Sequence, residues 1–405
     1  MELFHFYHHH AIRNLLKDDF WLFELSIWLH VVGRSLISIF IPILMWQMGF
    51  SLIAIIGYYA LLHAINIPLN FLAGSFVRRI GARWVIILSN FAIIGYFIVF
   101  DFLTSGDFVI LAILALLAAV YDALYWVAHL YLFIKSNDDP QKTNGKTGAL
   151  YSAKQIATMV GPIAGALILA FGSQTLLLIA SIVFFFLSIV PLIYVNGFSD
   201  KPTQWDKFTS FLSYFKSPVE RNNFISTGLY SIHNFAEFAL WPIFIFLIFQ
   251  TLESVAIIPV LIAATTIIFS LFTRRINART REKLIMTGAL ALALIWIVRM
   301  TFEWGPFYYI SIVLAGIFAL FVSIPLDSSV FIRAKQTDPL KTAVLRNVVA
   351  MTVKLFFFGG IFLFANAFGI FTPAFIITIV SLLILSVVNL YYMTADSEEF
   401  DAILG

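Results

Sequence analysis

A short basic turn, Gly74-Ser-Phe-Val-Arg78-Arg79-Ile80-Gly81-Ala82-Arg83, lies between two long apolar runs of the chain. The second half of the chain repeats it, again between two apolar runs, as Ser270-Leu-Phe-Thr-Arg274-Arg275-Ile276-Asn277-Ala278-Arg279. A second match follows each turn, because residues 135–143 and 335–342 both begin with Lys and end with Asp-Pro-x-Lys-Thr. Two matched landmarks at nearly the same spacing predict a duplicated unit.

The composition indicates a membrane protein. Of the 405 residues, 61% are hydrophobic and only 12% are charged, which is too little polar surface to cover a water-soluble globule. The apolar run that follows the polar N-terminal segment has no small-residue cleavage site, so we expect it to stay in the protein as the first helix. The absence of cysteine excludes disulfides, thiol catalysis and cysteine-ligated metals.

The apolar runs predict twelve membrane-spanning helices, since a bilayer core about 30 Å thick needs roughly twenty residues per helix. The predicted spans are residues 20–46, 51–77, 82–102, 107–134, 147–171 and 174–195, then 221–250, 253–273, 283–302, 306–332, 343–366 and 372–393. We therefore expect an all-α membrane protein with an N-terminal six-helix half (1–195), a polar linker (196–220) and a C-terminal six-helix half (221–405). Continuous apolarity excludes an outer-membrane barrel, whose strands alternate at period two.

The placement of the cations predicts the orientation. Of the 25 Lys and Arg residues, 20 lie in the two ends of the chain, in alternate loops beginning with the loop between the second and third spans, or within two residues of these loops. Lys and Arg are retained on the cytoplasmic side, so we expect a multi-pass protein of the cell (inner) membrane with both termini in the cytoplasm.

This organisation resembles the major facilitator superfamily of secondary transporters. The loop signature of that family, G-x-x-x-D-R-x-G-x-R, is matched by Gly74, Arg79, Gly81 and Arg83, with Arg78 in the position of the Asp. The family's helix 5 antiporter signature is similar to the fifth span, which keeps Gly148, Gly161, Pro162 and Gly165 and replaces two glycines by Ala157 and Ala166. The replacements are small, so close helix packing is preserved. The resemblance implies a small-molecule substrate and transport by alternating access.

Ionisable side chains inside the spans are the first candidates for a substrate or coupling site, because burying them in hydrocarbon is costly. Four spans carry polar stripes at helical spacing, and in the family that this chain resembles these four line the central cavity. The candidates are Arg34 and His30 in the first span, Asp122 and His129 in the fourth, Glu237 and His233 in the seventh, and Asp327 in the tenth. The alternative interpretation is structural: Arg34 pairs permanently with Asp122, Glu237 is neutral and hydrogen-bonded, and the histidines are packing residues.

Two lysines extend this set. Lys154 and Lys354 occupy nearly corresponding positions in the fifth and eleventh spans, and Lys354 lies too deep to reach the interface comfortably. Paired cations across a pseudo-twofold axis suit an anionic substrate, whereas the structural alternative pairs them with acidic side chains of the bundle. Glu237 or Asp122 is the predicted proton-coupling carboxyl, since no other acid lies as deep.

The arginine at position 78 predicts a gate with exchanged charges. In the family, an Asp at this position sits against the positive N-terminal end of helix 11 when the cytoplasmic side is shut. This chain instead places Asp338 before its eleventh span and Asp139 before its fifth. We expect Arg78 to meet Asp338 and Arg274 to meet Asp139 in the closed state, the alternative being that these arginines only contact lipid headgroups.

The sequence favours a proton-coupled secondary transporter of a small organic solute, with export ahead of organic-anion uptake or exchange. A lipid flippase and a non-transporting receptor on the same scaffold stay open as alternatives. We expect no enzyme activity, no cofactor and no metal site, because Walker, dinucleotide-binding and His-Glu-x-x-His patterns are absent from the chain. The expected partners are a substrate, the proton and membrane lipid, with no nucleic acid, and we expect a monomer.

Overall fold

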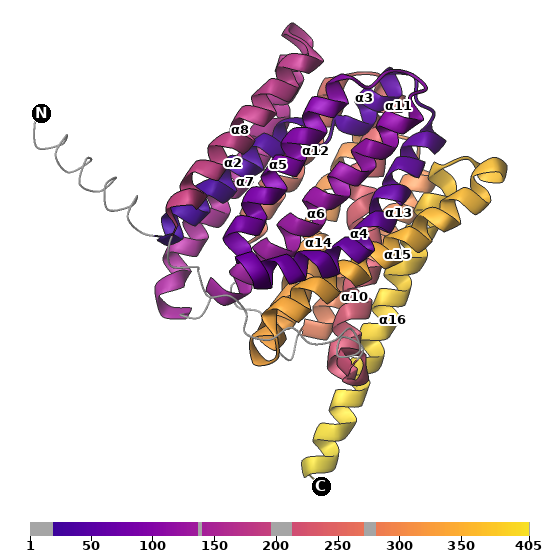
Figure 1. Ribbon diagram of the computed structural model, residues 1–405. Helices are drawn as coiled ribbons and strands as arrows, with labels where there is room; N and C mark the ends of the chain where they lie inside the picture. Colours follow the sequence, from indigo (N-terminus) through magenta and orange to yellow (C-terminus); the bar gives the residue numbers. More distant parts are fainter. Residues whose placement is uncertain (1–18, 137–139, 196–212, 271–280, 405) are drawn as a thin grey trace, which may run out of the picture.

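The computed structural model describes residues 19–136, 140–195, 213–270 and 281–404 (Figure 1). Its N-terminal half contains α2 (Asp19–Ile37), α3 (Ile41–Gln47), α4 (Leu52–Ile80), α5 (Ala82–Asp101), α6 (Phe108–Ser136), α7 (Pro140–Phe171) and α8 (Gln174–Tyr194). Its C-terminal half contains the short 3-10 turn Ser213–Lys216, α10 (Pro218–Phe235), the π-helical turn η2 (Ala236–Leu240), α11 (Trp241–Phe249), α12 (Leu252–Ser270), α13 (Arg281–Thr301), α14 (Gly305–Gln336), α15 (Pro339–Phe368) and α16 (Phe371–Leu404).

The helices confirm the predicted number of spans. Ten segments of the described chain are long and apolar enough to cross a membrane, and two shorter apolar segments, 155–171 and 252–268, belong to α7 and α12. The first span consists of α2 and α3, separated by a turn, and Pro42 starts the new helix. The seventh span consists of α10, η2 and α11, so its break is a π-helical turn rather than a loop. Twelve helices in two halves therefore account for the fold.

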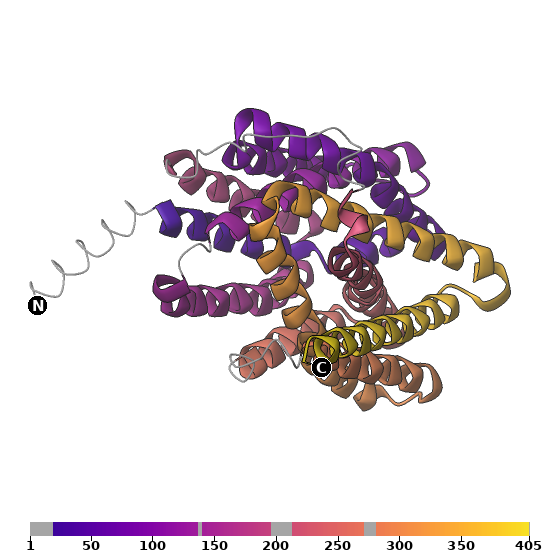
Figure 2. The same cartoon turned by 90° about the horizontal axis from the view of Figure 1, so that it is seen from below.

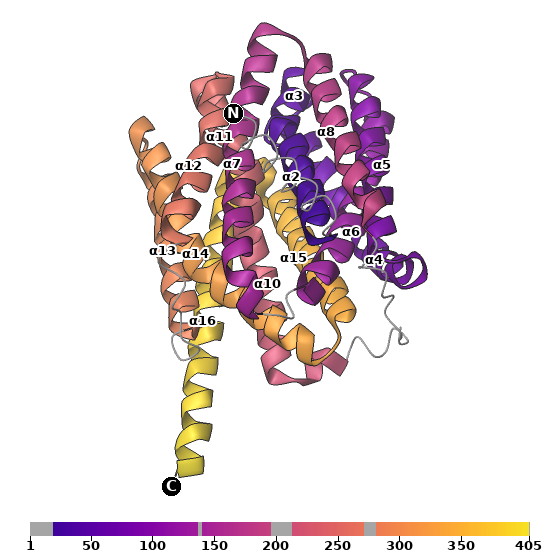
Figure 3. The ribbon, with the colours of Figure 1, turned by 90° about the vertical axis from the view of Figure 1, so that its left-hand side faces the viewer.

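Packing within each half is extensive, and several helix pairs join the halves. In the N-terminal half α2 packs on α7 and α8, while α4 and α5 pack on α6; in the C-terminal half α13 packs on α14 and α16, and α10 on α15 and α16. Contacts between the halves run mainly through α4 with α15 and α7 with α12. Figure 3 shows α12–α14 on one side and α4–α6 on the other, and Figure 2 shows the bundle along its helices.

The two ends of the bundle differ in charge. One end, called the basic face here, is the lower end in Figure 1, where α4 meets α5 and where α6 and α14 end. It carries Arg78, Arg79, Arg83, Lys135, Arg333 and Lys335. The opposite face carries Asp101, Asp107, Glu253 and Glu303. This asymmetry is the one used to predict the orientation.

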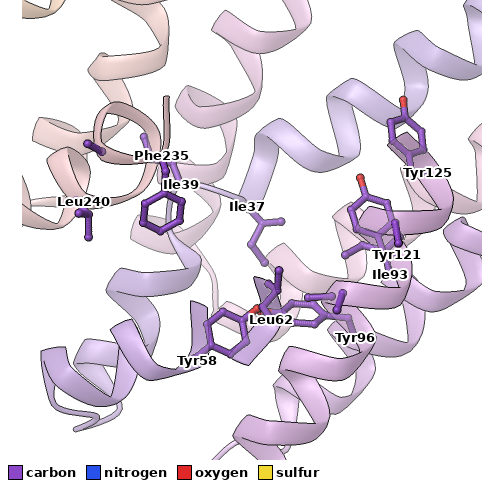
Figure 4. Packing of buried hydrophobic residues seen from close by; sticks show 14 of the residues in the cluster. Ile37, Ile39, Tyr58, Leu62, Ile93, Tyr96, Tyr121, Tyr125, Phe235 and Leu240 are labelled. Atoms are coloured by element: carbon purple, nitrogen blue, oxygen red, sulfur yellow. The ribbon is translucent and has the colours of Figure 1, made fainter. Parts of the chain in front are cut away.

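Aromatic and aliphatic side chains fill the interior of both halves (Figure 4). In the N-terminal half Tyr58 donates a hydrogen bond to Tyr96 at 3.2 Å between α4 and α5. At the basic face Leu130 and Ile134 of α6 pack against Ala334 and Ala343 of α14 and α15. This contact closes the interface between the halves at the basic face.

Candidate functional site

A partly buried carboxylate, Asp122 of α6, lies at the interface between the halves. Asn66 of α4 donates a hydrogen bond from Nδ2 to Asp122 Oδ2 at 3.0 Å. Asn70, one turn along α4, donates from its own Nδ2 to the backbone oxygen of Asn66 at 2.8 Å and to Asn66 Oδ1. This contact orients the Asn66 amide, so its donor faces Asp122. Asn66 and Asn70 of α4 therefore hold Asp122 in position.

Cations from both halves act on Asp122. Lys354, on α15, and Arg34, on α2, lie near enough for their charges to act on its carboxylate, although neither forms an ion pair with it within 4.0 Å. Lys354 is partly buried, whereas Arg34 is exposed and its guanidinium lies 5.5 Å from the centre of the Trp126 ring. Because α2 and α6 belong to one half and α15 to the other, this group of three charges, which we call the central site, spans the interface.

A histidine beside the central site has an unused polar atom. His63 of α4 is buried, and its Nδ1 lies 3.0 Å from Met351 Sδ on α15. Its Nε2 is buried and has no hydrogen-bond partner among the described residues. The positive charge of Lys354 acts electrostatically on this imidazole. A buried polar atom without a partner next to charged groups is a natural contact point for a bound solute.

An ion pair lies on the C-terminal side of the central site. Arg346 of α15 donates from Nη2 to Asp327 Oδ1 of α14 at 2.5 Å, and the two side chains are 24% and 38% exposed. Arg346 lies two turns from Lys354 on the same helix, and the two positive charges repel each other. The side chains of this pair and of the central site are three cations and two carboxylates; Glu24 of α2, whose charge acts on Tyr125 as that of Arg34 does, adds a third acid nearby.

Glu237 forms a buried ion pair that the sequence did not predict. Arg299 of α13 donates from Nη1 and Nη2 to the two oxygens of Glu237 at 2.6 and 2.9 Å, and its Nε donates to Ser311 at 2.8 Å. The guanidinium carbon lies 4.0 and 4.6 Å from the ring centres of Trp241 and Trp296. The Arg299 and Glu237 side chains are 0% and 6% exposed. The Glu237 carboxylate is thus fully engaged inside the C-terminal half.

The remaining candidate histidines contact their own halves. His30 Nδ1 lies 3.0 Å from Asn90 Oδ1, and its Nε2 lies 2.8 Å from the Tyr121 hydroxyl. His233 Nδ1 accepts a hydrogen bond from the Trp296 indole at 3.0 Å, and this donor requires an unprotonated Nδ1. His129 stacks on Tyr125 with ring centres 5.3 Å apart. These contacts match the packing interpretation more closely than a proton relay.

Comparison with known proteins identifies the family. A model described as Major Facilitator Superfamily matches residues 24–337. This chain belongs to the major facilitator superfamily. No curated protein matches it at the level of sequence. The family and the twelve-helix fold are those of a multi-pass membrane transporter, which confirms the resemblance found in the sequence.

Solved structures support the same fold. One match is a bacterial homologue of the iron transporter ferroportin in an outward-facing state, with a TM-score of 0.68 and 15% identity, covering 93% of this chain and 100% of that one. A second is such a homologue in the outward-facing state with soaked iron, with a TM-score of 0.67 and 15% identity, covering 92% and 98%. At this identity the likeness concerns the fold. In the described part of this superfamily member, no group of three His, Asp or Glu side chains could hold a metal ion.

The backbone conformation explains one glycine of the superfamily signature in the basic turn. Gly81 ends α4 with φ +90° and donates its N–H to Val77 O at 2.9 Å. Residues that carry a Cβ rarely adopt a backbone φ of this sign. Glycine at position 81 therefore allows α5 to start at the next residue. Gly74 is buried in α4, Arg79 is exposed, and Arg83 lies 4.9 Å from the centre of the Trp84 ring.

The predicted gate pair between Arg78 and Asp338 is not formed in this structure. Asp338 is the N-cap of α15, and its Oδ1 accepts from the N–H groups of Leu340 and Lys341 at 2.9 and 3.1 Å. Arg78 is exposed, and the described residues contain no ion pair between it and Asp338. Arg274 and Asp139 lie outside the described residues, and so does the side chain of Lys154.

The glycines of the helix 5 signature allow α7 to approach α2 closely. A Cβ at Gly161 would lie 2.0 Å from Ser35 Oγ, and a Cβ at Gly165 would lie 2.0 Å from Leu36 O. Ser35 also donates a hydrogen bond to Ala157 O at 3.0 Å, and Pro162 lies between the two glycines within α7. Close packing therefore explains these residues without reference to the direction of transport.

Proposed function

We propose that this protein is a proton-coupled secondary transporter that moves a small organic anion by alternating access. The observation that carries the proposal is the proximity of Asp122 to two cations from opposite halves, Arg34 and Lys354. A site built from both halves changes its exposure when the halves rock against each other.

Asp122 can link proton binding to anion binding. An ionised Asp122 neutralises part of the charge of Arg34 and Lys354. A protonated Asp122 leaves both cations available to a substrate carboxylate or phosphate, so proton and anion bind best together. Such positive coupling supports movement of both in the same direction, which favours anion uptake over the export that the sequence favoured.

Arg34 is suited to the substrate contact. A guanidinium presents two parallel N–H donors that match a carboxylate or phosphate, and its exposure leaves these donors accessible. The nearby Trp126 ring supports it from one side. The unused Nε2 of His63 offers an additional hydrogen bond on the α4 side.

Identifying the substrate is the first test. Purified protein is screened by thermal shift against mono- and dicarboxylic acids, phosphate esters, amines and divalent metal ions, because a ligand at 100 times its Kd stabilises by about 2.7 kcal/mol. We expect stabilisation by an anion, stronger at acid pH and lost in Arg34→Gln. Stabilisation by amines or metal ions alone contradicts an anion transporter.

Flux separates the transporter from the other interpretations. Proteoliposomes with an outward-directed or inward-directed pH gradient are loaded with the anion found in the screen. We expect accumulation on the alkaline side. Ligand binding without any flux supports the receptor alternative, and movement of labelled phospholipid supports the flippase alternative.

A further inference from the structure

An apolar groove lies on the outer surface of the N-terminal half, away from the central site. Its volume is about 320 Å³, within the roughly 300–1,000 Å³ range of small-molecule sites, and all its lining side chains are apolar. The lining includes Leu72 and Phe76 of α4, Leu88, Phe91 and Ala92 of α5, and Leu124 of α6. Leu72 and Phe91 are 53% and 52% exposed, so the groove is open to the surroundings of the bundle.

The groove leads toward a cationic rim at the basic face. On α4, Arg79 lies seven residues after Leu72 and three after Phe76, on the same side of the helix. On α5, Trp84 lies four residues before Leu88 and is 45% exposed. Arg83 stacks on the Trp84 ring at 4.9 Å. Arg79, Arg83 and Trp84 therefore form a rim at the end of the groove.

The rim has no acidic counterpart nearby on its own helices, since Asp101 ends α5 at the opposite face. Residues 25–100, which include all of α4 and most of α5, contain no Asp or Glu. Arg79 is exposed and forms no ion pair among the described residues. An anionic group is needed to balance this charge, and guanidinium groups bind phosphate well.

We propose that the groove binds one anionic phospholipid, with an acyl chain along α4–α6 and its phosphate against Arg79 and Arg83. In a membrane-spanning protein this surface faces lipid, and Trp84 suits the headgroup level. A second copy of the chain is the poorer occupant, since a symmetric contact through this face would bring like charges together. This site is independent of the central site and of the proposed substrate.

Native mass spectrometry of protein taken from nanodiscs tests the proposal. The discs contain equal amounts of phosphatidylglycerol and phosphatidylcholine with identical acyl chains. We expect one retained lipid per chain, with phosphatidylglycerol preferred. Since each surface cation near an anionic membrane contributes about fivefold, Arg79→Gln with Arg83→Gln should reduce this preference roughly 30-fold.

Two matched controls locate the site. Arg78→Gln removes an exposed arginine of the same turn that points to another side of α4, and should leave the preference unchanged. Ala92→Phe fills the groove and should reduce retention of both lipids, whereas Ile98→Phe, on the same helix outside the lining, should not. Equal retention of both lipids by the wild type, an equal effect of Arg78→Gln, or a disulfide-linked dimer of the Phe91→Cys variant overturns the proposal.

Discussion

Glu237→Gln tests whether the buried pair with Arg299 stabilises the C-terminal half or carries the coupled proton. The substitution keeps the shape of the side chain but removes its charge, and it leaves a guanidinium whose side chain is 0% exposed without a counter-charge. Removing one partner of a buried ion pair costs roughly 3–5 kcal/mol. One Arg299 hydrogen bond to the Gln carbonyl and the faces of Trp241 and Trp296 remain, so we expect about 3 kcal/mol.

The free energy of unfolding is measured by SDS titration in mixed micelles, followed by tryptophan fluorescence. Trp241 and Trp296, which contact the guanidinium, are two of the nine tryptophans that contribute to this signal. Arg299→Met should be destabilising to a similar extent. The combination Glu237→Leu with Arg299→Met removes both charges and should recover to within about 1 kcal/mol of the wild type, since apolar replacement of a buried pair is often neutral.

The flux of Glu237→Gln in proteoliposomes provides the decisive contrast. Wild-type stability of this variant, together with loss of gradient-driven accumulation and intact exchange, would refute the reasoning. That result would make Glu237 the coupling carboxyl. Reduced stability with coupled flux in the fraction that stays folded supports a structural pair.

Three further results are expected. Arg34→Lys should lose roughly tenfold in substrate affinity, nearly as much as Arg34→Ala, because an ammonium cannot form the parallel contact, and wild-type affinity in a binding titration contradicts this. Gly165→Ala should destabilise the protein in SDS titration, since the new Cβ would meet Leu36 O, whereas Gly95→Ala, with nothing within 4 Å, should not; equal effects contradict the packing argument. Arg78→Asp and Asp338→Ala should be additive in stability within about 0.5 kcal/mol, because Asp338 caps α15; larger coupling supports the predicted gate pair.

The number of spans and their approximate ends could be predicted because both depend on local hydropathy. The breaks in the first and seventh spans could not, although Pro42 and Pro242 mark the starts of α3 and α11. A π-helical turn depends on tertiary packing around Glu237 and Trp241 rather than on a local motif.

The polar stripe on the first span was predicted only in part. Steps of four residues advance by about 40° around an α-helix, so a stripe of several steps does not stay on one side. Ser26 and His30 consequently contact Ser188 and Asn90 inside their own half, while Arg34 is exposed. The stripe identified which positions of the helix are polar, but not which neighbouring helices their side chains face.

Long-range partners were the main omission. Arg299 lies in the last turn of α13, near the opposite face, and its partner Glu237 is 62 residues away along the chain. Arg346 was not singled out from the sequence, although it lies eight residues before Lys354, on the same side of α15. Such pairs could have been sought by comparing how deep in the membrane opposite charges lie on different spans, because two charges at equal depth can pair.

Gradient-driven accumulation by Asp122→Asn in proteoliposomes tests the central claim most directly. Asn retains the hydrogen bond from Asn66 but cannot take up a proton, and the partly buried position should tolerate it. The screened anion is measured under a pH gradient and in equal-pH exchange, with Asp327→Asn as the matched carboxylate control. The account predicts that Asp122→Asn loses accumulation and keeps exchange, while Asp327→Asn keeps accumulation. Full gradient-driven accumulation by Asp122→Asn would contradict it.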